Sequence, residues 1–289
     1  MHANGKEALK ALAQRFPQLY VSPAEGAQDL HRRAAAYGIE PDGTTLDHFI
    51  TTPEDELREV DTPAGPVEVL FLKERADFET FLQIVGHKSS PDSIARTVGA
   101  ITYRGLADWG KVAAAKAAYR ASGGDDWSAE FACLAKLPGA FRSELIVISE
   151  GPYSNVSADG TPYDEAEWLC VSREVRLHHE CAHVVCRRLM PEDVLPVWDE
   201  VTADVTGLLC ATGRYDAALA GRFLGVTAEG FAGGRLSEYL DEAQLSRIDA
   251  IAAEVYGALE KIEARTVCEP PKDPFGFLLD LKRDPLIGF

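Results

Sequence analysis

The sequence predicts an α+β protein, with a mixed N-terminal lobe that carries a small sheet and a mainly helical C-terminal lobe. Residues 56–60 and 67–72 alternate or run apolar on either side of a Pro- and Gly-containing segment at 61–65, a pattern typical of a β-hairpin. The chain beyond residue 172 is instead rich in segments with the apolar spacing of helices. Strands and helices that separate along a chain in this way favour the α+β class.

The other elements follow from local patterns. Helices are expected in residues 1–50, with breaks at Gly38 and 41–43. A short helix after the hairpin has Phe78, Phe81 and Leu82 on one face. Further along, the sequence predicts a strand at 97–103, helices at 111–119, 128–137, 215–223, 236–240 and 243–264, and a tail from residue 269 that lacks long helices and packs along the body of the protein.

A β-rich run at 144–149 is expected to form a further strand, which Gly151 and Pro152 end. We expect an edge strand beside a buried helix, where an extended peptide could be added as one more strand. The chain is then divided into three segments that pack as one compact unit. They are N-terminal helices plus the hairpin at 1–95, a lobe with the edge strand and the following helix at 96–190, and a helical lobe with an apolar tail at 191–289.

The charge of the chain limits its partners. It has 29 Lys and Arg against 46 Asp and Glu, a formal net charge of −17. No basic patch is available to neutralise phosphates, so we expect neither a nucleic-acid nor an anionic-membrane partner. The N-terminus lacks the apolar stretch of a signal peptide and no apolar run approaches a membrane span, which predicts a cytoplasmic protein. The six cysteines are then expected to be reduced, and none forms a C-x-x-C pair.

The most informative motif is H-E-x-x-H, formed by His179, Glu180 and His183. Two histidines four residues apart on a helix point the same way, so both imidazoles can reach one metal ion. Glu180 follows the first of them directly and can take a proton from a water on that metal. A helix is expected at 173–189, with Ser172 as its N-cap.

A second predicted helix supplies two acidic residues. Glu200 and Asp204 lie at i and i+4 on one face of a helix that begins near Pro196 and ends near Gly213. After a turn at 190–193, this helix would return antiparallel to the first one. Glu200 then becomes the candidate for a third metal ligand.

Other interpretations of these residues stay open. The two histidines could be core residues whose nitrogens are satisfied by the backbone. Glu200 could be an ion-pair partner of Arg176, with Asp199 as the ligand in its place.

The neighbours of the motif are expected to be structural. His178 points about 100° away from His179 around the helix, toward packing partners or solvent. Cys181 and Cys186 are expected to pack in the core. Three other histidines have no partner at ligand spacing and receive no role: His31, His48 and His87.

The combination of H-E-x-x-H with a later E-x-x-x-D resembles the gluzincin branch of the zincin metallopeptidases. The resemblance implies a zincin-like fold and one zinc ion per chain, bound by His179, His183 and Glu200. It implies that Glu180 is the general base and later returns the proton to the leaving amine. It also implies that Asp204 accepts the outer N–H of a ligand histidine and fixes its tautomer.

The matching residues span about a tenth of the chain. The wider pattern, with Gly-Pro-Tyr-Ser at 151–154 and Gly-Gly-Arg-Leu at 233–236, is similar to uncharacterised bacterial proteins and implies no substrate. Family members also carry a Tyr, His or Arg that stabilises the oxyanion, and no motif fixes that residue here. Four side chains are candidates for it: Tyr153, Tyr215, Arg235 and Tyr239.

These observations predict a zinc-dependent metallopeptidase that hydrolyses peptide bonds with a zinc-activated water, its partner being a peptide or a small amide. A narrow cleft would instead favour a zinc amidohydrolase that acts on a small-molecule amide or ester. A non-catalytic scaffold protein with structural zinc is the third interpretation, which a closed four-ligand site would support. The sequence leaves the substrate and the oligomeric state open.

Overall fold

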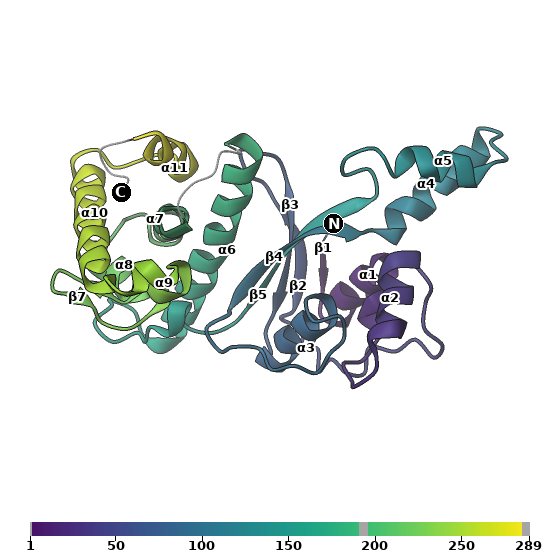
Figure 1. Cartoon of the computed structure of the whole chain (residues 1–289), viewed down its shortest axis with the longest axis horizontal. Coiled ribbons are helices and arrows are strands. Elements are labelled where there is room, and N and C mark those ends of the chain that lie inside the picture. The colour runs from purple at the N-terminus through teal and green to yellow at the C-terminus, as the bar shows by residue number, and fades with distance from the viewer. Residues whose placement is uncertain (1, 191–195, 285–289) are drawn as a thin grey trace. The chain divides into compact units, whose positions relative to one another are not determined.

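The computed structural model describes residues 2–190 and 196–284, and the chain divides into two units. Unit 1 consists of Met1–Val60 and Pro66–Ser149, and unit 2 of Asp61–Gly65 and Glu150–Phe289. A five-stranded sheet lies in unit 1, whereas unit 2 is mainly helical (Figure 1). The predicted α+β class is therefore confirmed.

The predicted segment boundaries, at 95 and 190, do not coincide with this division. The segment 96–190 contributes strands to the sheet of unit 1 and a long helix to unit 2. A strand joins the unit whose sheet it pairs with, whatever its distance along the chain.

The sheet of unit 1 has the strand order β1-β2-β3-β5-β4. Its strands are β1 His2–Asn4, β2 Glu56–Val60, β3 Val67–Leu72, β4 Ala100–Ala107 and β5 Arg142–Ser149. The predicted hairpin is confirmed: β2 and β3 are antiparallel, with Val60 opposite Val67. β3 and β5 are parallel and β4 is antiparallel to β5, so the sheet is mixed. The helices of this unit are α1 Lys6–Arg15, η1 Pro17–Tyr20, α2 Gln28–Tyr37, α3 Arg75–Val85, α4 Trp109–Ala121 and α5 Trp127–Leu134.

The prediction that residues 144–149 form an edge strand is wrong. β5 lies between β3 and β4 and pairs with both of them. Ile146, Val147 and Ile148 are all buried, so both faces of the strand are covered. An uninterrupted apolar run of this kind is typical of an internal strand. No peptide can therefore be added to β5.

Unit 2 is built on two long helices, α6 Glu165–Leu189 and α7 Pro196–Thr212. They approach closely at Gly207, where an added Cβ would lie 2.6 Å from the carbonyl oxygen of Val175. Figure 1 shows α7 nearly end-on beside α6, so the two helices cross rather than lie alongside each other. The predicted turn at 190–193 falls mostly on residues 191–195, outside the described part of the chain.

α6 begins at Glu165, not at residue 173 as predicted. Asp164 is its N-cap and forms a reciprocal capping box with Glu167. Ser172, the predicted N-cap, lies inside the helix, where its hydroxyl accepts the backbone N–H of Tyr153. A serine that looks like a cap in the sequence is thus used for a tertiary contact. The start of α7 at Pro196 and its end before Gly213 are as predicted.

Shorter elements complete unit 2, and the apolar tail is more helical than predicted. Residues 243–264, expected as one helix, form parts of two. The tail contains a ten-residue helix, because Asp273 caps it and a proline occupies its first position without loss of a hydrogen bond. The predicted packing of the tail is confirmed, since Phe277, Leu278 and Leu281 are buried. The elements are η2 Tyr153–Asn155, α8 Ala217–Leu224, β6 Val226–Thr227, β7 Gly230–Phe231, η3 Arg235–Tyr239, α9 Glu242–Leu245, α10 Ile248–Cys268 and α11 Pro274–Arg283.

Two other features bear on the sequence predictions. Within residues 2–190 and 196–284, no helix combines the length and the apolar character that crossing a membrane requires. The six cysteines are all free in the structure.

Candidate metal site

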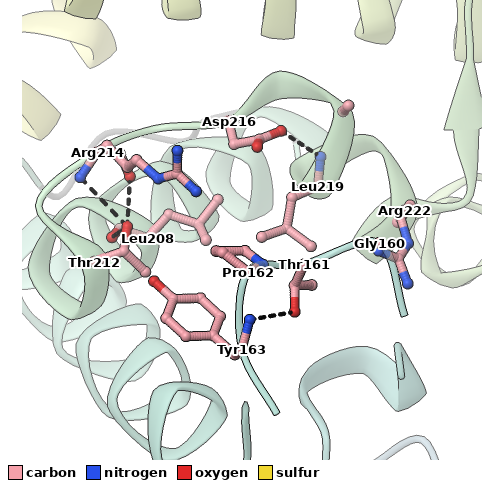
Figure 2. A pocket seen from close by; sticks show the side chains of 11 residues that line it. Gly160, Thr161, Pro162, Tyr163, Leu208, Thr212, Arg214, Asp216, Leu219 and Arg222 are labelled. Atoms are coloured by element: carbon pink, nitrogen blue, oxygen red, sulfur yellow. Dashed lines mark hydrogen bonds between the residues drawn. The ribbon is translucent and has the colours of Figure 1, made fainter. Parts of the chain in front are cut away.

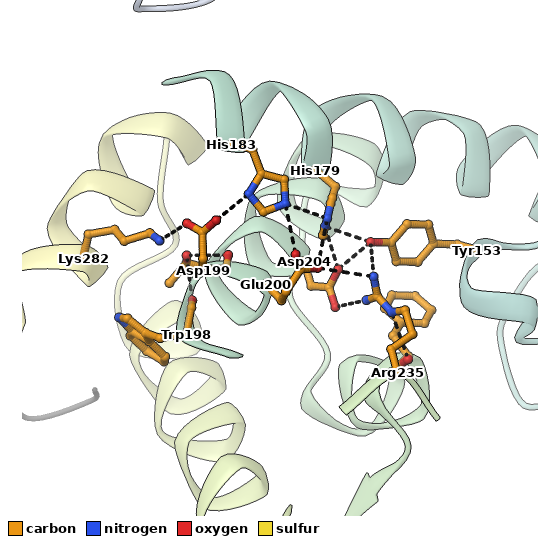
Figure 3. Close-up of polar contacts among 11 residues, drawn as sticks. Tyr153, His179, His183, Trp198, Asp199, Glu200, Asp204, Arg235 and Lys282 are labelled. Atoms are coloured by element: carbon orange, nitrogen blue, oxygen red, sulfur yellow. Dashed lines mark hydrogen bonds and ion pairs between the residues drawn. The ribbon is translucent and has the colours of Figure 1, made fainter. Parts of the chain in front are cut away.

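His179 and His183 lie one turn apart on α6 and point toward Glu200 of α7 (Figure 3). The Nε2 atoms of the two histidines are 3.0 Å apart. Glu200 Oε2 is 3.4 Å from Nε2 of His179, and its Oε1 is 3.5 Å from Nε2 of His183. The structure thus brings the three predicted ligands together, as a group that could hold a metal ion.

The separations of these atoms fit a tetrahedral metal. Ligand atoms about 2.0–2.1 Å from zinc, at tetrahedral angles, lie about 3.3 Å from one another. The three separations, 3.0, 3.4 and 3.5 Å, lie close to that value, the last two being to the two different oxygens of the Glu200 carboxylate. In addition, two imidazole lone pairs that face each other at 3.0 Å repel, unless a proton or a metal ion lies between them.

The outer nitrogen of His179 is held by Asp204, as the resemblance implies. Nδ1 of His179 lies 2.8 Å from Asp204 Oδ1, which also accepts the hydroxyl of Tyr153 at 2.5 Å. The other carboxylate oxygen, Oδ2, accepts from Nη2 of Arg235 at 2.6 Å. Because a carboxylate only accepts, Nδ1 carries the proton and Nε2 presents its lone pair to the metal position.

Asp204 is a permanent anion in this environment. Its side chain is 1% exposed. Burial alone would raise the pKa of Asp204, but the charge of Arg235 and the hydrogen bond from His179 outweigh it and hold the pKa at about 2. Asp204 therefore stays ionised and keeps its three donors.

The outer nitrogen of His183 is held in the same manner, which the sequence did not predict. Nδ1 of His183 lies 2.7 Å from Asp199 Oδ2. The ammonium group of Lys282 on α11 pairs with the other oxygen of that carboxylate (Figure 3). Burial opposes ionisation of Asp199. The hydrogen bond from His183 and the charge of Lys282 outweigh burial and lower the pKa of Asp199. Asp199 was the alternative metal ligand in the sequence. In the structure it holds the imidazole of His183, a candidate ligand, instead.

The charges of the site favour an added cation. Three carboxylates, of Asp199, Glu200 and Asp204, face the two permanent cations Arg235 and Lys282. Burial opposes charge on His179, yet hydrogen bonds to Asp204 and Glu200 outweigh it and raise the pKa of His179 to about 10. Without a metal, the carboxylates therefore hold a proton on this imidazole. A divalent cation bound by Nε2 would supply positive charge in place of that proton.

A strained turn positions Tyr153 behind His179. Ser154 and Asn155 adopt left-handed backbone conformations, with φ of 53° and 57°. Such conformations cost about 1 kcal/mol or more for residues other than glycine and concentrate at functional sites. The hydrogen bond from the backbone of Tyr153 to Ser172 Oγ, 3.0 Å long, ties this turn to α6.

Arg176, which the sequence left open as an ion-pair partner of Glu200, supports the same turn. Its guanidinium donates to the carbonyl oxygens of Gly151 and Pro152, both at 3.3 Å. It also lies 5.8 Å from the centre of the Tyr153 ring. These contacts give Arg176 a structural role on the outer side of the site.

The remaining residues of the motif helix differ in their surroundings. Glu180 follows His179 and is half-buried, and it does not belong to the group of three that could hold a metal. Nε2 of His178 lies 3.7 Å from Oε2 of Glu174, one turn earlier on the helix. Cys181 and Cys186 are buried in the packing of the helix.

The four candidates for the oxyanion-stabilising residue differ in their surroundings. Tyr153 and Arg235 are engaged with Asp204 on the outer side of His179. The hydroxyl of Tyr215 is buried without a hydrogen-bond partner in the described part of the chain. Burial and the nearby charge of Glu200 raise the pKa of Tyr239. Two other candidates contact the candidate ligands directly, since the hydroxyl of Tyr153 lies 2.8 Å from His179 Nδ1 and Nη1 of Arg235 lies 3.7 Å from Glu200 Oε2.

A comparison with protein-family models matches residues 1–268 to the "Family of unknown function (DUF7005)". The chain belongs to this family. No curated protein and no solved structure matches it. The DUF7005 match includes α6, α7 and η3, and with them every residue of the site except Lys282, which lies beyond residue 268.

Two hollows in unit 2 of this DUF7005 protein lie apart from the metal-site residues. The smaller, of about 100 Å³, is lined by residues 160–163, by the end of α7 and by α8 (Figure 2). A water occupies about 30 Å³ of liquid, so this hollow has room for a few waters and not for a ligand of ordinary size. The larger, of about 480 Å³, is formed by the residues that join α10 to α11. Neither is lined by a metal-site residue.

Proposed function

We propose that this protein is a zinc-dependent metallohydrolase of the peptidase type. One observation carries the proposal: His179 Nε2, His183 Nε2 and the Glu200 carboxylate converge, with each separation near that of two ligands on a tetrahedral metal. The resemblance of the motif to gluzincins and the outer carboxylates on both histidines support it. Zinc is the metal that this ligand set suits best.

The ligand set favours a catalytic over a structural metal. Structural zinc sites are usually closed by four protein ligands, whereas catalytic ones have three and an open position. The group found within residues 2–190 and 196–284 has three members. Asp199, which could have closed the site, is paired with His183 and Lys282.

Zinc bound here would polarise a substrate carbonyl and lower the pKa of a water toward about 7. Glu180, next to His179 on α6, would accept the proton of the attacking water and return it to the leaving amine. Asp204 and Asp199 would keep the proton of each histidine on Nδ1, so that both Nε2 lone pairs stay directed at the metal. Tyr153, Arg235 and Tyr239 all lie near the candidate ligands and are our candidates for the group that stabilises the oxyanion.

A substrate panel tests the proposal. The zinc-loaded protein is incubated with an unfolded protein, a set of short peptides, and acyl amides and esters. We expect peptide hydrolysis that a chelator removes and added zinc restores, because the metal is required for the reaction. Hydrolysis of acyl amides or esters alone would replace the peptidase by an amidohydrolase. A protein with its full complement of zinc that hydrolyses nothing in the panel would contradict the enzymatic proposal.

A further inference from the structure

The two histidines of the metal site are supported by matching chains of contacts. Arg235 contacts Asp204, which holds Nδ1 of His179. Lys282 contacts Asp199, which holds Nδ1 of His183 (Figure 3). In each chain, a cation engages one carboxylate oxygen and the imidazole engages the other. The second chain begins in the apolar tail of the protein.

We propose that Lys282 is a positioning residue of the metal site: its ammonium group fixes the Asp199 carboxylate, which in turn fixes the imidazole of His183. The inference rests on metal binding by the site, as in the proposed function. It adds that α11, outside the segment matched to the family, is a working part of that site.

The burial of Lys282 indicates that its ammonium group has a specific partner. Its side chain is only 1% exposed, although a lysine on a surface helix ordinarily extends its ammonium group into water. Withdrawing an ammonium from water is unfavourable unless a counter-charge compensates. Asp199 provides that charge, and its side chain is itself 34% exposed. Without Lys282, this carboxylate would be free to turn outward to solvent.

The helix that carries Lys282 is anchored to both metal-binding helices. Leu278 packs with Ala182 of α6 and Ala203 of α7 in one buried cluster. Leu281 is fully buried as well. The backbone of α11 is therefore held by apolar contacts that do not depend on the Lys282–Asp199 pair. Removing the charge should leave α11 in place and release the carboxylate.

A Lys282→Met variant tests the inference, because methionine retains the apolar stem and removes the charge. Zinc affinity is measured by competition with a chelator. Loss of a residue that supports a metal ligand typically weakens binding 10–100-fold. We expect about tenfold here, since Lys282 acts through Asp199. Arg283→Met removes a charge from the neighbouring, exposed position of the same helix and should leave the affinity unchanged. Lys282→Arg retains the charge and should restore most of the affinity.

Proton NMR provides a readout that a merely structural role would not move. In the zinc-loaded protein, each ligand histidine should show a downfield Nδ1–H resonance, assigned with the Asp199→Asn and Asp204→Asn variants. In Lys282→Met, the resonance of His183 should shift or exchange away. The resonance of His179 should remain, because Asp204 and Arg235 are untouched.

The double variant Lys282→Met/Asp199→Asn decides whether the lysine acts through the aspartate. If it does, Lys282→Met causes no further loss of zinc affinity when Asp199 is already replaced. Additive losses, or an unchanged His183 resonance in a folded Lys282→Met protein, would overturn the inference while the metal site stands. A wild-type protein that binds no zinc would remove the proposed function itself, so the two failures are distinguishable.

Discussion

The Glu180→Gln variant is expected to retain its zinc and to lose hydrolysis by a factor of about 10²–10⁴. The amide has nearly the shape of the carboxylate but cannot accept the proton of the attacking water. Zinc binding should persist, because the group that could hold the metal consists of His179, His183 and Glu200 and does not include Glu180. The measurement compares kcat and zinc content of the two proteins under the same conditions.

A Glu165→Gln variant is the matched control. Glu165 lies at the exposed start of the same helix, so its replacement removes the same charge far from the site. Its activity should equal that of the wild type. Undiminished turnover by the Glu180→Gln protein would show that another group takes the proton, and the proposed mechanism would be wrong.

The second large effect concerns stability. Replacing Arg235 by Met should lower the free energy of unfolding by about 3–5 kcal/mol, since it removes the guanidinium that pairs with Oδ2 of the buried, ionised Asp204 carboxylate. Arg235 contacts that carboxylate at 2.6 Å, and the two side chains are 12% and 1% exposed. The remaining donors, His179 and Tyr153, satisfy only the other oxygen. Urea unfolding of the two proteins gives the difference.

Arg214→Met, at an exposed position of the same unit, should change stability by less than about 0.5 kcal/mol. Adding Asp204→Asn to Arg235→Met removes the stranded charge, so the double variant should be more stable than the sum of the two single losses implies. An Arg235→Met protein as stable as the Arg214→Met control would show that Asp204 does not need the guanidinium.

The ligands of the candidate site could be predicted from the sequence because their geometry is local. His179 and His183 are placed by one turn of helix, and Glu200 and Asp204 by one turn of another. The resemblance to gluzincins implied that Asp204 accepts the outer N–H of a ligand histidine, and the structure shows that this histidine is His179. The sequence did not predict how the two helices pack against each other. Gly207 permits their close approach.

The support of His183 could not be predicted in this way. Lys282 is 83 residues from Asp199 and has no fixed spacing to it. The only signal was a lysine at the end of an apolar tail, where a buried charge requires a partner. Asp199 was visible as an acid beside Glu200, but the sequence could not distinguish a ligand from the support of one.

The errors in the fold arose where long-range contacts override local patterns. The run at 144–149 has the composition of a strand, yet only the pairing of β5 with both β3 and β4 shows that it is internal. Ser172 has the chemistry of an N-cap, yet its hydroxyl is used by Tyr153. Asp164 and Glu167 form the actual start of α6, and their spacing is that of a capping box.

Metal content is the most direct test of the site. Mass spectrometry of the purified wild-type protein, beside a His183→Ala variant, gives the zinc bound per chain. We expect about one zinc per wild-type chain and a loss of most of it in the variant, because two protein ligands remain where three are needed. If neither protein contains metal, even after incubation with zinc, the convergence of His179, His183 and Glu200 does not form a metal site, and the metallohydrolase proposal is wrong.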